Sequence, residues 1–235
     1  MAVLEILIFI TSFFVIYWVL YGQKKFNESL MPKRKTELKA IIFDLDGVII
    51  DSFDRQFQIF NELRKRYGLH DVNEKMFREK IWGNSLETIA NEFFKKQSYD
   101  EIKKRHEFLV RKYINKVKLM DNAKEVIQKI KRSGIKTGLV TNATKNRTKK
   151  ELEFLKIKDK FDIILTADDV EKPKPYPDGI LKACERLNVQ PDEVIYVGDR
   201  ENDYKAGKSA GTFVVGLNTK GDLVISELKD LMRLL

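Results

Sequence analysis

The chain has 235 residues, of which 43% are hydrophobic, so it is long enough for one domain with a sizeable insertion and too apolar for global disorder. A single cysteine, Cys184, excludes a disulfide framework and a cysteine-based zinc site. The net charge of +9 is compatible with a nucleic-acid partner, but the basic residues are scattered and not interleaved with aromatic residues. We therefore expect no nucleic-acid partner.

Residues 2–21 form an apolar stretch that contains a single charged residue, Glu5. At about 1.5 Å per residue, a helix of this length covers the roughly 30 Å of a bilayer's hydrocarbon core. The stretch has no basic start and no small-residue cleavage site, which argues against a signal peptide. We expect a transmembrane helix within residues 1–22.

A basic linker follows at residues 23–39, where lysine and arginine outnumber acidic residues. Basic residues beside a membrane span stay in the cytoplasm, so this linker predicts a single-pass membrane protein with a cytoplasmic catalytic domain. The membrane is then a partner through the N-terminal helix. Alternatively, translation begins at Met31, and the protein is soluble in the cytoplasm.

Residues 40–43 are a short apolar run, typical of a strand that is buried on both faces. Two acidic residues, Asp44 and Asp46, follow at once, and Gly47 allows the backbone to turn sharply after them. Carboxylates at the end of a buried strand are costly unless a cation or a reaction uses them. This pair is therefore a candidate for the centre of an active site.

Residues 53–118 carry apolar residues three and four positions apart, beginning with Phe53, Phe57 and Phe60. This spacing predicts several amphipathic helices inserted after the first strand. A helical insertion at this point would lie above the strand ends and could close over a ligand as a cap.

Helices and strands alternate in the remainder of the chain. The expected strands are at 135–140, 161–165, 194–197 and 213–215, and the expected helices are at 123–130, 144–156, 178–188 and in a segment ending at Gly211. Such alternation predicts right-handed crossovers and a largely parallel sheet. The predicted fold is α/β, with a Rossmann-like core at residues 40–52 and 119–235 and a helical cap at residues 53–118.

Polar side chains follow four of these expected elements. They are Asp44 and Asp46, Thr141 and Asn142, Lys174 in a proline-rich loop, and Asp199 and Asp203. Since parallel strands end at the same edge of a sheet, these groups should converge on one pocket. A few carboxylates with room for water suit Mg²⁺, while a hydroxyl, an amide and a lysine suit phosphoryl oxygens. A carboxylate can itself attack phosphorus, so the set predicts phosphoryl transfer.

The same stretches resemble the four motifs of the haloacid dehalogenase superfamily, in the same order. They read D-L-D-G-V at 44–48, T-N at 141–142, K-P-Y-P-D at 174–178 and G-D-R-E-N-D at 198–203. The helical insertion stands where the family has its first-type cap. The resemblance covers residues 40 to 231, and the D-G-x-I-x-D-S stretch ending at Ser52 suits both phosphoglycolate-phosphatase-like and β-phosphoglucomutase-like members.

The resemblance implies a role for each residue that would contact the phosphoryl group. Asp44 is implied to be the nucleophile, and Asp46 to protonate the leaving group and then to activate water. Thr141 and Asn142 are implied to hold the phosphoryl group. Lys174 is implied to neutralise it, and is favoured over Lys172 because K-P-x-P-D fits the following helix better from 174.

The resemblance also implies a Mg²⁺ site. Asp44 and Asp199 are implied ligands, Asp46 is implied to reach the metal through its backbone carbonyl, and Asp203 to support the site from behind. Arg200 stands where a serine is common in the family, and its role is left open.

These observations predict a Mg²⁺-dependent phosphatase that acts on a small phosphorylated metabolite through an aspartyl-phosphate. One alternative is a phosphosugar mutase of the β-phosphoglucomutase type, in which the phosphoryl group passes to a second hydroxyl. Another is a membrane-tethered binding module without catalytic turnover. Substrate identity and oligomeric state are left open.

Overall fold

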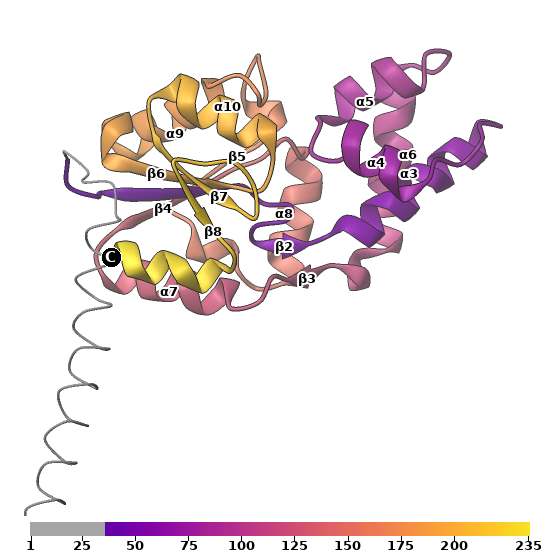
Figure 1. The fold of residues 1–235 in the computed structure, drawn as a ribbon. Helices are drawn as coiled ribbons and strands as arrows, with labels where there is room; N and C mark the ends of the chain where they lie inside the picture. The colour runs from indigo at the N-terminus through magenta and orange to yellow at the C-terminus, as the bar shows by residue number, and fades with distance from the viewer. Residues whose placement is uncertain (1–35) are drawn as a thin grey trace, which may run out of the picture. The chain divides into compact units, whose positions relative to one another are not determined.

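A parallel sheet forms the centre of the computed structural model, which describes residues 36–235 (Figure 1). The six strands lie in the order β5-β4-β1-β6-β7-β8, and every neighbouring pair is parallel. Their bounds are β1 Ala40–Phe43, β4 Lys136–Val140, β5 Ile163–Leu165, β6 Val194–Gly198, β7 Phe213–Leu217 and β8 Leu223–Ile225. β1 lies between β4 and β6, so the acidic residues that follow it emerge in the middle of the sheet. The predicted α/β fold with a Rossmann-like sheet is confirmed.

Helices cover both faces of this sheet. One face carries α7 (Ala123–Arg132), α8 (Lys145–Phe154) and the 3₁₀ segment η6 (Leu228–Leu234), and the other carries α9 (Asp178–Leu187) and α10 (Glu201–Ala210). Successive side chains of a strand point to opposite faces, which explains why Ile41 and Phe43 lie in one core cluster and Ala40 and Ile42 in the other.

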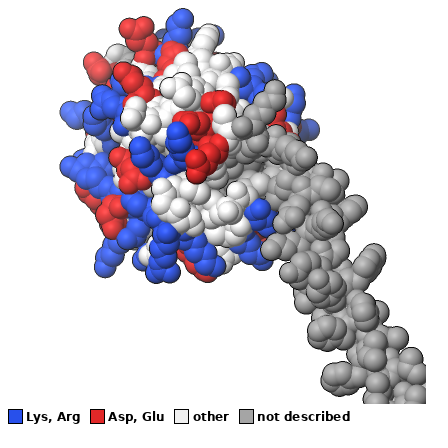
Figure 2. Space-filling view, turned by 90° about the vertical axis from the view of Figure 1, so that its left-hand side faces the viewer, with Lys and Arg blue, Asp and Glu red and all other residues white. Residues whose placement is uncertain are grey.

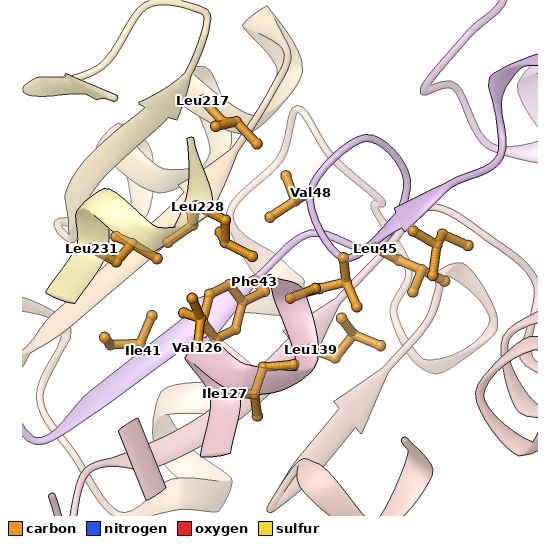
Figure 3. Close-up of a cluster of buried hydrophobic side chains, with 14 of the residues drawn as sticks. Ile41, Phe43, Leu45, Val48, Val126, Ile127, Leu139, Leu217, Leu228 and Leu231 are labelled. Atoms are coloured by element: carbon orange, nitrogen blue, oxygen red, sulfur yellow. The ribbon is translucent and has the colours of Figure 1, made fainter. Parts of the chain in front are cut away.

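The first of these clusters holds β1 in place. In Figure 3, Phe43 lies close to Val126 and Ile127 of α7, with Leu231 of η6 nearby. All four side chains are at most 2% exposed. Because this packing fixes β1 over its whole length, Asp44 leaves the sheet from a rigid support.

Along the chain, four helices follow β2 (Ile50–Asp51) and precede β3 (Lys118–Leu119). These two short strands pair with each other in antiparallel fashion. The four helices are α3 Phe53–Arg66, α4 Glu74–Lys80, α5 Leu86–Phe93 and α6 Tyr99–Lys112. They have a core of their own that is rich in aromatic contacts, such as Phe53 with Trp82 at 5.2 Å between ring centroids. We retain the division into a cap at residues 53–118 and a core as a proposal.

Besides the short strands β2 and β3, the helix α4 and the strand β8 differ from the sequence-based expectation. α4 was not expected, because its two apolar residues, Met76 and Phe77, are adjacent and give no helical periodicity. β7 was expected to be the last strand, but β8 pairs in parallel with it at the edge of the sheet. β8 is an apolar run of only three residues, which is at the short end of the range for a strand.

The predicted membrane localisation is corrected. Among residues 36–235, the longest helices are α3 and α6, with 14 residues each. Such a helix is about 21 Å long, and a bilayer core is roughly 30 Å thick. No helix in this part of the chain is long and apolar enough to cross a membrane. The expected span at residues 1–22, and the linker at 23–39 up to residue 35, lie outside the described residues. We no longer count the membrane as a partner.

Basic side chains are spread over the surface of the described residues. On the face shown in Figure 2, acidic side chains lie among them. Several of the basic groups form ion pairs, such as Lys208 with Asp222 at 2.8 Å and Lys131 with Asp162 at 2.8 Å. The positive net charge is therefore partly compensated locally.

Candidate active site

A cavity of about 60 Å³ lies between the ends of the strands and helices α3 to α6. One wall is polar and comes mainly from the loops after the strands, with Asp44, Asp46, Thr141, Asn142 and Lys174. The other wall is apolar and comes from the helices and from the turn after α4, including Ile59, Phe60, Leu63, Phe77 and Trp82. Five of the seven residues predicted from the sequence thus line one cavity.

Lys174 joins the carboxylates on the polar wall. Its Nζ donates to Asp44 Oδ1 at 2.6 Å, to Asp203 Oδ1 at 2.6 Å and to the Tyr196 hydroxyl at 3.1 Å. Burial lowers the pKa of Lys174, but Asp203 and Asp44 outweigh it and raise the pKa well above its usual value. We call Asp44, Lys174, Tyr196, Asp199 and Asp203 the Asp44 cluster.

The Asp44 cluster contains more negative than positive charge when ionised, with three carboxylates and one ammonium group. Burial raises the pKa of Asp44 well above its usual value, and Lys174 opposes this shift. Burial and the neighbouring Asp203 raise the pKa of Asp199 to about 7. Acidic groups thus outnumber basic groups in the Asp44 cluster, even when the neighbouring Arg200, whose Nε lies 3.3 Å from Asp199 Oδ2, is counted.

The geometry of the Asp44 cluster fits a hard cation. Carboxylate oxygens of Asp44, Asp199 and Asp203 lie within 4.8 Å of one another. Asp199 Oδ1 is buried and has no hydrogen-bond partner among residues 36–235. Both oxygens of Asp203 already accept hydrogen bonds, Oδ1 from Lys174 and Tyr196 and Oδ2 from the Arg200 N–H. Asp44 and Asp199 are thus better placed to bind a metal directly, and Asp203 to hold the cluster together.

Gly47 allows Asp199 to approach the loop after β1. Its φ of +82° is in the left-handed region, and a Cβ at this position would lie 2.3 Å from Asp199 Oδ2. Any other residue would meet both the steric clash and backbone strain. The glycine that follows the two acidic residues therefore has a packing function as well as a turn function.

Asn142 holds the loop that carries Lys174. Its Oδ1 accepts from the Lys174 N–H at 2.9 Å, and its Nδ2 donates to the carbonyls of Lys174 at 2.9 Å and Gly83 at 3.0 Å. The side chain is thus used for positioning. The Thr141 hydroxyl accepts from the Ala143 N–H at 3.1 Å, which leaves its own hydrogen available for a ligand. Lys172 is exposed, so it is Lys174 that reaches Asp44.

Asp46 belongs to a second buried group of charges, which the sequence did not predict. We call it the Asp46 cluster, and it consists of Asp46, Arg55, Gln56, His106, Arg147 and Glu151. Arg147 Nη2 donates to Asp46, and its Nε donates to Glu151 Oε1 at 2.8 Å. Arg55 donates to the same Glu151 oxygen. Two carboxylates thus face two guanidinium groups, and the cluster is balanced.

Two neutral side chains complete the Asp46 cluster. With its amide oxygen turned toward the arginines, Gln56 accepts from Arg147 Nε at 2.9 Å and Arg55 Nη2 at 3.0 Å. Burial, with Arg147 and Arg55 nearby, lowers the pKa of His106 to about 3. The imidazole is therefore neutral at physiological pH.

The arginine contacts also affect Asp46. Burial raises the pKa of Asp46, but Arg147 and a hydrogen bond from Ser52 outweigh it and lower the pKa overall. As long as Arg147 stays bonded to it, Asp46 is ionised.

Arg200 connects the loop after β6 to the helical segment. Its Nη1 donates to the Arg78 carbonyl at 3.1 Å, its guanidinium lies 5.5 Å from the Trp82 ring centroid, and its Nε lies 3.3 Å from Asp199 Oδ2. The residue that departs from the family pattern thus links a candidate metal ligand to α4 and the turn after it.

Comparisons with known proteins agree with this geometry. A family model described as haloacid dehalogenase-like hydrolase matches residues 41–217. Pyrophosphatase PpaX of Bacillus cereus is 27% identical over 84% of this chain and 96% of its own. The structure of a predicted phosphoglycolate phosphatase from Haemophilus somnus superposes with a TM-score of 0.74 at 24% identity, over 85% of this chain and 99% of its own. That of a β-phosphoglucomutase from Clostridium difficile does so with a TM-score of 0.70 at 28% identity, over 83% and 93%.

Proposed function

Because the chain belongs to the haloacid dehalogenase-like hydrolase family, we propose that this phosphatase hydrolyses a small phosphate ester with the help of Mg²⁺, through an aspartyl-phosphate on Asp44. The observation that carries the proposal is the position of Lys174. Its Nζ lies 2.6 Å from both Asp44 and Asp203, beside the unpartnered Asp199 oxygen. This arrangement supports a nucleophilic carboxylate, a phosphate-neutralising ammonium group and a cation site within one cavity.

The first half-reaction uses the two acidic residues after β1. An Asp44 carboxylate oxygen attacks phosphorus, and the bond to the leaving oxygen breaks. Asp46 takes up a proton from solvent once Arg147 releases its carboxylate and passes that proton to the leaving oxygen, and the Thr141 hydroxyl and Lys174 hold the phosphoryl oxygens. Positioning and charge neutralisation provide most of the rate enhancement in such a transfer.

The second half-reaction releases phosphate. Asp46, now without its proton, takes one from a water molecule, which attacks the phosphoryl group on Asp44 and regenerates the carboxylate. Asp44 and Asp199 are the proposed carboxylate ligands of Mg²⁺, with the backbone carbonyl of Asp46, and Asp203 supports them. When bound, Mg²⁺ neutralises charge on the transferring phosphoryl group.

The substrate of the proposed reaction is small, because the cavity is about 60 Å³. The pyrophosphatase name of the Bacillus cereus relative and the phosphoglycolate phosphatase name of the Haemophilus somnus structure suggest two compounds to test first.

A phosphatase assay over a panel of phosphorylated metabolites tests the proposal. The panel includes inorganic pyrophosphate, phosphoglycolate, sugar phosphates and an aryl phosphate, each with Mg²⁺ and with a chelator. We expect Mg²⁺-dependent phosphate release from the aryl phosphate and from at least one metabolite. Release without any sugar bisphosphate separates a phosphatase from a mutase. No release from any compound would favour a non-catalytic binding module.

A further inference from the structure

Arg147 lines the same cavity as Asp44 and Lys174, and His106 and Gln56 lie beside it on the cavity wall. We infer that Arg147, together with His106 and Gln56, binds a second acidic group of the substrate. The substrate is then a phosphate ester whose leaving group carries a carboxylate or a further phosphate. This inference rests on the proposed phosphatase function, since it assigns the part of the substrate that leaves.

The hydrogen-bonding capacity of Arg147 is not exhausted. Its Nε and Nη2 donate to Glu151 and Asp46, but its Nη1 has no hydrogen-bond partner among the described residues. A planar guanidinium group binds a carboxylate or phosphate through two parallel N–H groups. The Nη1 side of the Arg147 guanidinium group can thus donate hydrogen bonds to a ligand at the cavity wall.

His106 provides an independent observation. Its Nδ1 is buried and unpartnered within residues 36–235, although the residue lines the cavity and is 7% exposed. A buried polar atom without a partner is costly and calls for a ligand. A neutral imidazole beside Arg147 can donate one hydrogen bond to an anion without repelling it.

The charges of the Asp46 cluster also favour a second acidic group on the substrate. At rest, Asp46 and Glu151 face Arg55 and Arg147, and the cluster is balanced. When Asp46 engages the leaving oxygen instead of Arg147, Glu151 alone faces two buried guanidinium groups. An uncompensated buried charge is strongly unfavourable, and an acidic group on the substrate restores the balance.

A purely structural role for Arg147 accounts for less of the geometry. It explains the bonds to Asp46 and Glu151, but not the available Nη1 nor the unpartnered His106 Nδ1 on the same wall. The apolar wall, with Ile59, Phe60 and Leu63 of α3, fits the carbon part of such a substrate.

Matched substrate pairs test the inference on the full chain. One pair is phosphoglycolate and its uncharged amide, and the other is ethane-1,2-diol bisphosphate and the monophosphate. We expect kcat/KM to favour the acidic member of at least one pair by about tenfold or more, the usual effect of a charge-assisted hydrogen bond. The two pairs distinguish a carboxylate from a phosphate as the second group.

Substitutions on α8 assign the preference to Arg147. Arg147→Gln should reduce the preference to about onefold, even if it lowers turnover of both members, and Arg147→Lys should retain part of it. Lys149→Gln removes a positive charge from an exposed position of the same helix and should leave the preference unchanged. If Arg147→Gln does not fold, His106→Gln should still reduce the preference. A wild-type preference of about onefold, or an unchanged preference in the Arg147 variants, would overturn the inference.

A binding measurement tests the binding of a second acidic group independently of the proposed phosphatase function. Calorimetric titration of the Asp44→Asn protein with the same pairs measures the preference without turnover. Equal affinity for acidic and neutral members overturns the inference. A wild-type protein that binds the acidic member more tightly but releases no phosphate from the aryl ester contradicts the proposed function alone.

Discussion

The Asp44 cluster and the Asp46 cluster lie at the same cavity but differ in charge. The Asp44 cluster has three carboxylates and a single ammonium group, and Asp199 Oδ1 has no partner among the described residues. The Asp46 cluster has two carboxylates and two guanidinium groups and is balanced as it stands. We therefore propose that a cation completes the first cluster, and that an anion completes the second only when Asp46 acts on the substrate.

From this difference we infer separate roles for the two clusters: the Asp44 cluster in catalysis and the Asp46 cluster in substrate selectivity. An excess of acidic groups that does not depend on the substrate suits a resident metal, which we propose acts on every substrate. A positive charge that becomes uncovered only during the reaction suits a group on the substrate. We therefore expect changes in the Asp44 cluster to affect all substrates alike, and changes in the Asp46 cluster to depend on the leaving group.

The largest effect is expected for Asp44→Asn. It removes the nucleophile and a proposed metal ligand, so kcat/KM should fall by at least about 10⁴-fold for every substrate. The fold should persist, because burial already favours the neutral form of Asp44. Steady-state kinetics and circular dichroism measure both effects. Asp51→Asn, at an exposed position of β2, is the matched control and should stay active. Residual activity above a tenth of the wild-type value would contradict the covalent mechanism.

Removal of the metal should also abolish activity on every substrate. Treatment with a chelator should stop phosphate release, and Mg²⁺ should restore it. Ca²⁺ should restore little, because it prefers more ligands and a looser geometry. Atomic absorption confirms that the metal has been removed. Undiminished turnover of the metal-free protein would show that the charge deficit of the Asp44 cluster is met in another way.

Asp46→Asn should have a smaller effect that depends on the leaving group. General acid–base catalysis is worth about 10²–10⁴-fold, and an aryl leaving group needs less protonation than an alkyl one. Transfer to Asp44 should therefore slow more for alkyl than for aryl phosphates. Pre-steady-state kinetics with both ester types measure this difference. Equal losses in the transfer step would argue against Asp46 as the proton donor.

The smallest effect concerns the stability of the Asp46 cluster in acid. The pKa of His106 is about 3 in the folded protein because of burial and of Arg147 and Arg55, and its ordinary value is 6.5. Below pH 6.5 the unfolded chain binds a proton that the folded chain does not, so this contribution to stability is complete above pH 6.5 and falls toward pH 3. At pH 5 the loss is roughly 2 kcal/mol.

Urea unfolding at pH 7.5 and pH 5 measures this loss. His106→Gln should remove about 2 kcal/mol of the pH dependence. His70→Gln, at the exposed second histidine, should leave it unchanged. The same pH dependence in wild type and His106→Gln would show that His106 is not the source.

The Asp44 cluster, apart from Tyr196, and most of the fold were predictable from the sequence because their signals are local. β1 was expected at residues 40–43 and lies at Ala40–Phe43. A buried strand followed by two acidic residues is a short pattern. The sheet order then brings Asp199 to the same place, since β6 pairs directly with β1.

The Asp46 cluster was not predictable because its signals resemble those of surface residues. Arg147 and Glu151 stand four positions apart, as in an ordinary exposed helical ion pair. Arg55 lies between the apolar residues of α3, and its partner Glu151 comes from α8, which packs beside α6. Such a contact depends on tertiary packing, which a single helix does not reveal.

The central claim is that the Asp44 cluster performs covalent phosphoryl transfer, and acid-quenched mass spectrometry tests it most directly. Asp46→Asn protein is mixed with an aryl phosphate and Mg²⁺, quenched in acid within one turnover, digested and sequenced by fragmentation. We predict a phosphoryl group on Asp44 that is absent from the Asp44→Asn protein and from a reaction with chelator. Turnover without any phosphorylated Asp44, or a phosphoryl group on another residue, would contradict the account.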